Sequence, residues 1–287
     1  MADGFFPKRK PLTKDDIKRL KESLPKKVEI NPEGTKVTQK EEEITDISPI
    51  LETRSDEISV PLSAEEIRAF QVYASMLKEK NKVMNLTAVD DDKGIAMKHF
   101  IDSLTLCPYI REEENKADRN LTFIDVGTGA GFPGLPVKIS CPELSVTLMD
   151  SLDKRLKFLN EVITALNLTE CVTVHSRAED AGRNKKFREK YDIATARAVA
   201  RLSVLAEYCL PLVKVGGVFP AMKSHSEEEE TEAGKAIALL GGTIEKTDTF
   251  TLPGTDMERS IIVVRKVRPT PARFPRKAGT PSKSPLI

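Results

Sequence analysis

The sequence predicts an α/β protein in which a largely parallel sheet carries helices on both faces. From Leu121 onward, short apolar segments typical of buried strands alternate with amphipathic helical segments. Repeated strand–helix units of this kind form parallel sheets. A glycine-rich loop also follows the first of these strands. The 287 residues, of which 39% are hydrophobic, suffice for one large domain with an appendage.

Residues 1–60 form the first region and are dense in charges of both signs. One weak helix is expected from Thr13 to Leu24, and the stretch from Lys26 to Arg54 has little periodicity. Such segments bury too little apolar surface to fold by themselves. We therefore expect residues 1–60 to be a flexible or loosely packed extension without chemistry of its own.

Residues 61–118 predict a small helical subdomain. Its first helix begins at Ser63-Ala64-Glu65-Glu66, a capping-box pattern in which Ser and Glu satisfy each other's backbone amides. The apolar residues of this helix recur at helical spacing and are Ile67, Phe70, Ala74 and Leu77. A second helix is expected from about Asp92 to Cys107.

Residues 119–268 supply the predicted sheet. Five strands are expected to be parallel: Leu121–Val126, Ser145–Met149, Val172–Val174, Tyr191–Thr195 and Gly217–Met222. The helices between them should open at Pro136, at about Leu152, at Leu202 and at the glutamate run 227–232. Thr243–Phe250 and Ser260–Val267 should form a final antiparallel pair.

The chain from Arg265 to its end has seven Lys/Arg, no acidic residue and five prolines. Proline removes backbone donors, so this composition disfavours a regular helix or a central strand. We expect residues 269–287 to be an extended basic strap.

The bulk composition excludes several classes of protein. The net charge of +1 means that any nucleic-acid-binding surface must be local. The four cysteines and three histidines are scattered without metal-ligand spacing, so we expect buried thiols, no metal site and a cytoplasmic location. No apolar run reaches the ~20 residues of a membrane span. Nothing indicates an obligate partner subunit, so a monomer is expected.

The loop Asp125-Val126-Gly127-Thr128-Gly129-Ala130-Gly131 is the main candidate binding site. Glycines between a strand and a helix let backbone amides approach a ligand closely. Dinucleotide-binding loops use the spacing G-x-G-x-x-G, but here the third glycine comes one residue early. Asp125 also suits a cationic amino-acid group better than a pyrophosphate. A nucleoside carrying such a group is favoured, and a tight turn without a ligand is the alternative.

Three further segments should meet this loop, because the carboxyl ends of parallel strands share one edge. Asp150 can accept hydrogen bonds from both hydroxyls of a ribose, or it can cap the next helix. The segment Ser176-Arg177-Ala178-Glu179 can frame a planar base with its backbone groups. Arg197, in Thr195-Ala196-Arg197-Ala198, should face the reacting centre or the substrate. For Arg177 and Arg197 the alternative is a surface ion pair.

The sequence resembles the ribosomal small-subunit methyltransferase G family, also called the glucose-inhibited division protein B family, over about residues 62–287. The resemblance rests on ordered blocks: Phe123 to Pro136, Met84-Asn85-Leu86-Thr87-Ala88, His99-Phe100-Ile101-Asp102-Ser103-Leu104, Asp150 to Arg155, Ser176 to Glu179, Thr195 to Ala200, and Pro269-Thr270-Pro271 through Pro281.

This resemblance implies a Rossmann-like, seven-stranded class I methyltransferase sheet and transfer of a methyl group from S-adenosylmethionine to N7 of one guanine in 16S ribosomal RNA. It implies that Gly127 and Phe132 border the methionine and adenosine moieties, that Ala178 and Glu179 lie by the adenine, and that Arg197 is a further contact. The expected cofactor-binding set is Asp125, Gly127, Gly129, Phe132, Asp150, Ala178, Glu179 and Arg197.

The residues are compatible with a ring-nitrogen acceptor. An Asp/Asn-Pro-Pro-aromatic motif for exocyclic amines is absent, and Cys171 and Cys209 have core spacing rather than that of a nucleophile. Guanine N7 has a free lone pair and loses no proton. We therefore expect no catalytic acid or base, with Arg177 and Arg197 as positioning residues.

RNA binding would need local basic residues. The candidates are Arg155, Arg177, Lys223, Arg273, Arg276 and Lys277, with Arg265, Lys266 and Arg268 in the same tail. Phe274 could stack on a base or, as we favour, pack on the domain. The alternatives to an rRNA methyltransferase are a small-molecule methyltransferase of the same fold and a non-catalytic RNA-binding assembly factor.

Overall fold

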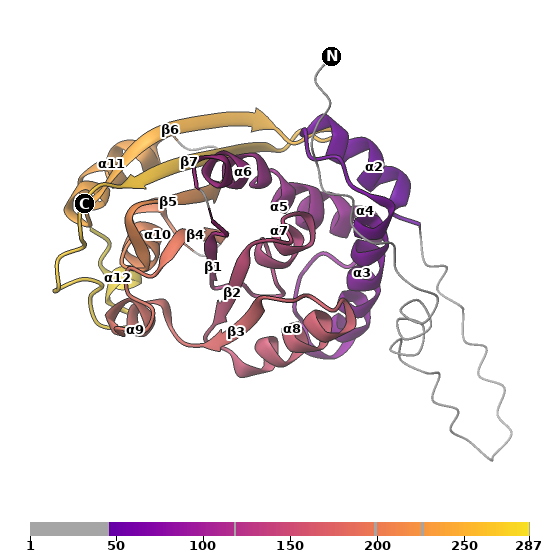
Figure 1. The fold of residues 1–287 in the computed structure, drawn as a ribbon, viewed down its shortest axis with the longest axis horizontal. Coiled ribbons are helices and arrows are strands. Elements are labelled where there is room, and N and C mark those ends of the chain that lie inside the picture. The colour runs from indigo at the N-terminus through magenta and orange to yellow at the C-terminus, as the bar shows by residue number, and fades with distance from the viewer. Residues whose placement is uncertain (1–45, 118, 198–199, 225–226, 287) are drawn as a thin grey trace, which may run out of the picture. The chain divides into compact units, whose positions relative to one another are not determined.

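Seven strands form a single sheet in the order β3-β2-β1-β4-β5-β7-β6 (Figure 1). β1 to β5 are parallel, and β7 pairs antiparallel with both β5 and β6. The predicted parallel sheet with a final antiparallel pair is confirmed. The strands are β1 (Thr122–Val126), β2 (Ser145–Asp150), β3 (Cys171–His175), β4 (Tyr191–Arg197), β5 (Val213–Lys223), β6 (Gly242–Thr251) and β7 (Glu258–Lys266).

The computed structural model describes residues 46–117, 119–197, 200–224 and 227–286. The helix expected at Thr13–Leu24 lies outside these residues. The described helices are α2 (Ser48–Glu57), α3 (Ala64–Met84), α4 (Asp92–Gly94), the π-helix η1 (Ile95–Ile101), α5 (Asp102–Leu104), α6 (Cys107–Lys116), α7 (Gly134–Ser140), α8 (Asp153–Ala165), α9 (Ala178–Arg183), α10 (Leu202–Cys209), α11 (Glu227–Leu239) and α12 (Thr280–Lys283).

Helices cover both faces of the sheet, as Figure 1 shows with α3, α7 and α8 on one side and α9, α10 and α11 on the other. Successive strand residues alternate between two apolar cores: Phe123 packs into the first and Ile124 into the second. A strand buried on both faces is therefore apolar throughout, which is why these strands were recognisable in the sequence.

The helices of residues 61–118 do not form a core of their own. Leu77 of α3 and Ile110 of α6 lie in the same apolar core as Phe123 and Val146 of the sheet. The capping box at the start of α3 is confirmed, because Ser63 Oγ accepts from the amide of Glu66 and a Glu66 carboxylate oxygen accepts from the amide of Ser63 at 2.8 Å.

Residues 46–60 are packed rather than loose, so the expected extension is wrong for this part. They include α2, whose Leu51 is fully buried, and Val60, which is also buried. α2 packs against α3 and η1. The ten-residue helix has few apolar positions and therefore shows no periodic apolar face, so no local pattern revealed it.

The helix expected from Asp92 to Cys107 is interrupted. The π-helix η1 replaces regular α-helix at Ile95–Ile101, the turn at Thr105–Leu106 ends it, and α6 then starts at Cys107. A π-helix shifts the following side chains around the helix axis, and such segments are frequent at functional sites. Here it carries His99 and is followed directly by Asp102.

The basic strap is more ordered than expected. Within residues 269–287, Thr280–Lys283 form the short helix α12. Arg265 and Lys266 belong to β7, in agreement with the strand predicted at Ser260–Val267. Phe274 is buried, so packing on the domain, the favoured interpretation of this residue, is confirmed. All four cysteines are buried free thiols.

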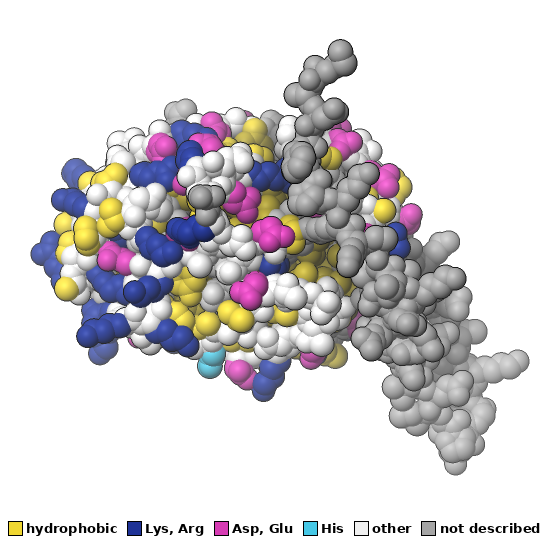
Figure 2. Space-filling view, in the orientation of Figure 1, with side chains coloured by type: hydrophobic (Ala, Val, Ile, Leu, Met, Phe, Trp, Pro, Cys, Tyr) yellow, Lys and Arg dark blue, Asp and Glu magenta, His cyan; other side chains and the backbone are white. Residues whose placement is uncertain are grey.

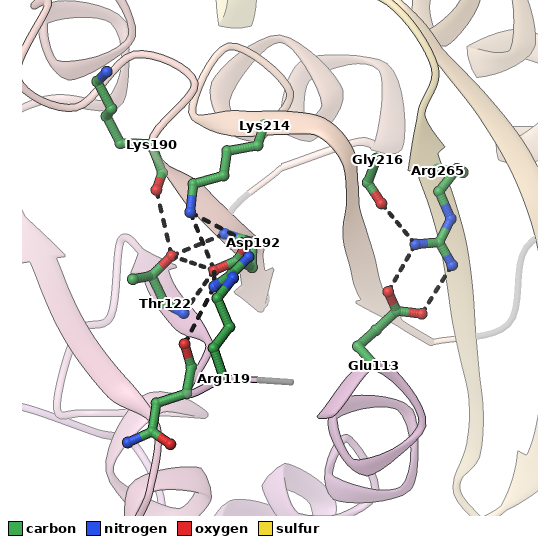
Figure 3. Close-up of polar contacts among 9 residues, drawn as sticks. Glu113, Arg119, Thr122, Lys190, Asp192, Lys214, Gly216 and Arg265 are labelled. Carbon is green, nitrogen blue, oxygen red and sulfur yellow. Dashed lines mark hydrogen bonds and ion pairs between the residues drawn. The ribbon is translucent and has the colours of Figure 1, made fainter. Parts of the chain in front are cut away.

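The amino ends of the strands are joined by a dense polar network (Figure 3). The Asp192 carboxylate accepts from the Arg119 guanidinium at 2.6 and 2.9 Å, from the amide and hydroxyl of Thr122, and from Lys214 at 3.2 Å. Beside it, Arg265 binds Glu113 and the carbonyl of Gly216. These contacts fasten β1, β4, β5 and β7 at the edge opposite the glycine loop.

Candidate active site

The glycine loop after β1 has a left-handed backbone that exposes one surface. Gly129 and Gly131 have φ values of 61° and 107°. A Cβ on Gly131 would lie 2.5 Å from Tyr73 Oη, so this glycine is needed for packing. A Cβ on Gly129 would meet nothing nearer than the Gly127 carbonyl oxygen at 4.0 Å. The loop therefore packs on one side and leaves space above Gly129 on the other.

Asp125 orders this loop and retains one unused acceptor. Its Oδ2 accepts from Thr128 Oγ1 at 2.7 Å and from the Gly134 amide at 2.9 Å. Its Oδ1 is buried and has no hydrogen-bond partner among the described residues. Burial raises the pKa of Asp125 to about 6, although the bonds from Thr128 and Gly134 oppose this rise. A buried carboxylate oxygen without a partner fits a cationic or N–H-bearing ligand group.

Asp150 connects the end of β2 to the same loop. Its Oδ2 accepts from the Gly129 amide at 3.0 Å and from Arg155 Nη1 at 3.2 Å, and its Oδ1 accepts from the Leu152 amide at 2.9 Å. The carboxylate is 3% exposed, and Arg155 lies over it. Leu152, rather than Asp150, is the residue that precedes α8. A ribose could reach Oδ2 only if Arg155 moved aside.

Arg197 at the end of β4 is held from two directions. Its Nη1 donates to Asp102 Oδ2 at 2.9 Å and to the Lys98 carbonyl at 3.1 Å. The guanidinium carbon lies 5.2 Å from the centroid of the Phe132 ring, which is a cation–π distance. The second oxygen of Asp102 accepts from Arg259 Nε at 2.7 Å. Arg197 is therefore paired, as the surface alternative supposed, but its side chain is only 13% exposed.

The roles of Asp102 and Arg259 could not be predicted from the sequence. Asp102 stood within a recognised sequence block, but nothing local indicated that it bridges two arginines. Arg259 lies 157 residues away on β7, so only the folded chain brings the two together. The result is one carboxylate that fixes an arginine on each of two strands.

His99, on the π-helix η1, packs against the same Phe132 ring as Arg197. Its ring stacks on Phe132 with centroids 4.4 Å apart, and its Nε2 lies 2.7 Å from Thr87 Oγ1. Its Nδ1 is buried and, within the described residues, has no hydrogen-bond partner. Burial, together with the nearby Arg197 charge, lowers the pKa of His99 to about 4. The imidazole is therefore neutral at pH 7.

The segment after β3 only partly matches its prediction. Ala178 and Glu179 begin α9 instead of remaining in a loop, and Arg177 precedes the helix as an exposed residue. The Glu179 carboxylate accepts from the Gly279 amide at 2.8 Å, so this side chain holds the C-terminal tail. The backbone groups of Ala178 and Glu179, which the sequence analysis expected to frame a base, therefore lie in the first turn of α9. The Ser176 amide, which donates to the Asp150 carbonyl, keeps the segment next to the loop.

The family model described as rRNA small subunit methyltransferase G matches residues 66–258. A protein of Acetivibrio thermocellus named Ribosomal RNA small subunit methyltransferase G is 57% identical over 227 residues, which are 79% of this chain and 91% of that protein. One of the same name from Lactobacillus johnsonii is 51% identical over 226 residues, covering 78% and 93%.

The chain belongs to the rRNA small subunit methyltransferase G family.

Because the family consists of rRNA methyltransferases, the basic residues are candidate RNA contacts. The structure shows which of them are exposed and which are already bonded to other groups of the protein. Arg276 binds the fully buried Glu207 at 2.6 Å, so its expected contact with RNA is not supported. Lys223 donates to the Ala200 carbonyl at 3.0 Å. Arg177, Arg273 and Lys277 are exposed.

Two of the remaining tail candidates are also engaged. Arg265 pairs with Glu113 and Glu245, and Lys266 is fully buried against backbone carbonyls. Among the described residues, no group of three His, Cys, Asp or Glu side chains could hold a metal ion. In the same residues, no helix has the length and apolar character needed to cross a membrane.

Proposed function

We propose that this protein transfers the methyl group of S-adenosylmethionine to N7 of a guanine in 16S ribosomal RNA, acting as a monomer on the small ribosomal subunit. The observation that carries the proposal is the cluster at the carboxyl edge of the sheet. There Asp125, Gly129, Asp150 and Arg197 lie at the ends of adjacent strands, in a chain of the methyltransferase G family. This is the edge at which open α/β sheets bind ligands.

The residues at this edge fit the cofactor. The unpartnered Asp125 Oδ1 would accept from its ammonium group, and the open space above Gly129 would accommodate its chain. Asp150 would accept from the ribose hydroxyls once Arg155 leaves it, and the backbone of Ala178 and Glu179 would border the adenine. When bound, S-adenosylmethionine supplies an electrophilic methyl group on a sulfonium.

The reaction requires these side chains to orient the substrate and does not require them to transfer a proton. Guanine N7 attacks with a free lone pair and no proton has to leave. Arg197 is locked by Asp102 against Phe132, which suits a group that orients the base and excludes water. His99, with a pKa of about 4, carries no proton to donate as an imidazolium at pH 7. We therefore assign no catalytic acid or base, and no metal.

Labelled S-adenosylmethionine tests this proposal when it is supplied with purified small subunits, with free 16S rRNA, and without RNA. Recovery of label as 7-methylguanosine only in the RNA samples supports it, and label at another atom overturns it. Label incorporation without RNA would favour the small-molecule methyltransferase. RNA binding without any cofactor binding would favour an assembly factor.

A further inference from the structure

An exposed group of cations, which we call the basic ridge, lies along two segments that pack on each other. Figure 2 shows Lys and Arg gathered over the part of the molecule that carries α9 and α12 in Figure 1. The first segment runs from the end of α9 to β4, and the second is the C-terminal tail. The basic ridge consists of Arg183, Lys185, Lys186, Lys190, Arg273, Lys277 and Lys283, all of them exposed.

The cations of the basic ridge differ from those elsewhere on the surface. Lys80, Lys82 and Lys116 each lie within ion-pair distance of a glutamate. By contrast, no member of the basic ridge has an ion-pair partner in the part of the chain that the structure describes. Their positive charge is therefore not cancelled locally.

The carboxylates near the basic ridge are occupied. Glu207 is fully buried against Arg276, and Glu179 is buried and accepts from the Gly279 amide. Glu189 accepts from the Thr270 amide and lies 3.3 Å from Lys266. Asp180 on α9 is exposed, and it is a single negative charge beside seven positive ones. The surface potential of this face is therefore positive.

The two segments are fastened together, so the backbone that carries the basic ridge is held in place. Arg188 donates to the carbonyls of Phe274 at 2.7 Å and Thr270 at 2.6 Å, and Arg183 Nε donates to the Pro275 carbonyl at 2.8 Å. The backbone of Gly182 lies so close to Pro275 that a Cβ there would be 2.8 Å from its ring. A preorganised scaffold loses little conformational entropy when a partner binds.

The basic ridge also leads to the candidate active site. The bond from the Gly279 amide to Glu179 ties the tail to the start of α9, directly after the exposed Arg177. The neighbouring Ser176 amide donates to the Asp150 carbonyl. A strand of RNA whose guanine lies at the carboxyl edge can therefore continue over α9 and the tail.

We propose that the basic ridge binds the phosphate backbone of the substrate RNA beyond the target guanine. The proposal rests on the proposed function, which names RNA as the substrate. Phosphate is the partner that unpaired, exposed Lys and Arg side chains fit, and such contacts hold the nucleic acid in register without reading its sequence. Arg273 and Lys277 were already candidates from the sequence, whereas Arg183, Lys185, Lys186, Lys190 and Lys283 are new.

The test compares two triple variants of the full chain that lose the same charge. Lys185→Ala/Lys186→Ala/Lys190→Ala removes part of the basic ridge, and Lys80→Ala/Lys82→Ala/Lys116→Ala removes paired cations elsewhere. The ridge variant should bind 16S rRNA about tenfold or more weakly at physiological salt, and its slope of log K against log salt should be shallower by about 2 to 3. The control variant should match the wild type.

RNA binding is measured by filter binding without cofactor, and KM, kcat and cofactor Kd are measured separately. A higher KM for RNA with unchanged kcat and cofactor Kd supports the proposal. Unchanged RNA affinity and salt slope in the ridge variant overturn the proposal. It is also overturned if the ridge variant binds whole subunits more weakly but binds naked RNA as well as the wild type does, because this result would indicate an acidic protein partner. Failure of the proposed function would appear instead in the wild type, as absent or misplaced methylation.

Discussion

Buried polar side chains at the two ends of the parallel strands differ in how completely they are hydrogen-bonded. At the amino ends, Asp192 is surrounded by donors from Arg119, Thr122 and Lys214 (Figure 3). At the carboxyl ends, Asp125 Oδ1 is buried without a partner in the described residues, as is Nδ1 of His99 on the neighbouring helix η1. A fully satisfied carboxylate stabilises the fold, whereas a partly satisfied one retains bonding capacity for a ligand.

The pKa values follow this difference. Burial by itself raises the pKa of Asp192, but the bonds from Arg119 and Thr122 overcome it and hold that pKa well below its usual range. Burial of Asp125 is not compensated in this way, so its pKa rises to about 6. One edge of the sheet is therefore built for stability and the other for binding and chemistry, and variants at the two edges should fail differently.

The largest effect is expected from Arg197→Ala at the carboxyl edge. Loss of an oriented cation beside the reacting centre should lower kcat/KM for RNA methylation about 100-fold or more. The variant should still fold, because Asp102 keeps its bond to Arg259, although loss of a mostly buried ion pair should lower the melting temperature. Steady-state kinetics and thermal unfolding check this, and wild-type turnover in the variant would remove Arg197 from the site.

Asp192→Asn at the amino edge should lower stability rather than activity. Loss of the charged acceptor should lower the free energy of unfolding by about 2–3 kcal/mol at pH 7, while the specific activity of the folded protein stays within about twofold. Asp90→Asn, at an exposed carboxylate, is the control and should change the free energy by less than about 0.5 kcal/mol.

This effect has a defined pH dependence. Because the pKa of Asp192 is lower in the folded protein than in the unfolded chain, its stabilisation is present above about pH 4 and is lost as the pH falls through the lowered folded-state pKa. Denaturant unfolding at several pH values measures the difference between variant and wild type. A difference that grows as the pH falls below 4 would contradict the assigned network.

Asp102→Asn should produce a smaller catalytic defect. An asparagine of the same size keeps the packing but weakens the hold on Arg197 and Arg259, so kcat should fall about tenfold while the cofactor Kd stays near the wild-type value. Asp248→Asn, which removes a carboxylate bonded to Tyr109, is the matched control. Equal kinetics in both variants would mean that Asp102 has only a structural role.

The smallest effect concerns the pH dependence of cofactor binding. If Asp125 must be ionised to accept from a cationic group, and its pKa is about 6, the affinity should fall about fourfold between pH 7 and pH 5.5. Titration calorimetry across this range measures the slope. Asp125→Asn should abolish that pH dependence, and a persisting slope in this variant would assign it to another group.

Local signals in the sequence were enough for the sheet and the glycine loop. The central strands β1, β2 and β4 are mostly apolar because both of their faces are covered. The capping box at Ser63 and the loop from Asp125 to Gly131 depend on neighbours within a few residues. These features could be predicted because the residues that determine them are adjacent in the chain.

Long-range partners could not be predicted in this way. Arg276 looked available for RNA, but it is bonded to Glu207, 69 residues earlier in the chain. The Asp102–Arg259 bond and the burial of α2 likewise depend on segments that only folding brings together. A charged residue can be placed by its sequence pattern, but whether it is free or paired depends on the tertiary structure.

The most direct test of the central claim is nucleoside mass spectrometry of 16S rRNA after reaction with labelled S-adenosylmethionine. It should be run with wild-type, Asp192→Asn and Arg197→Ala proteins under conditions in which all three are folded. We expect labelled 7-methylguanosine from the wild type and Asp192→Asn, and a strong loss from Arg197→Ala. Label in a different nucleoside, or equal 7-methylguanosine from all three, would contradict the assignment of methyl transfer to the carboxyl edge.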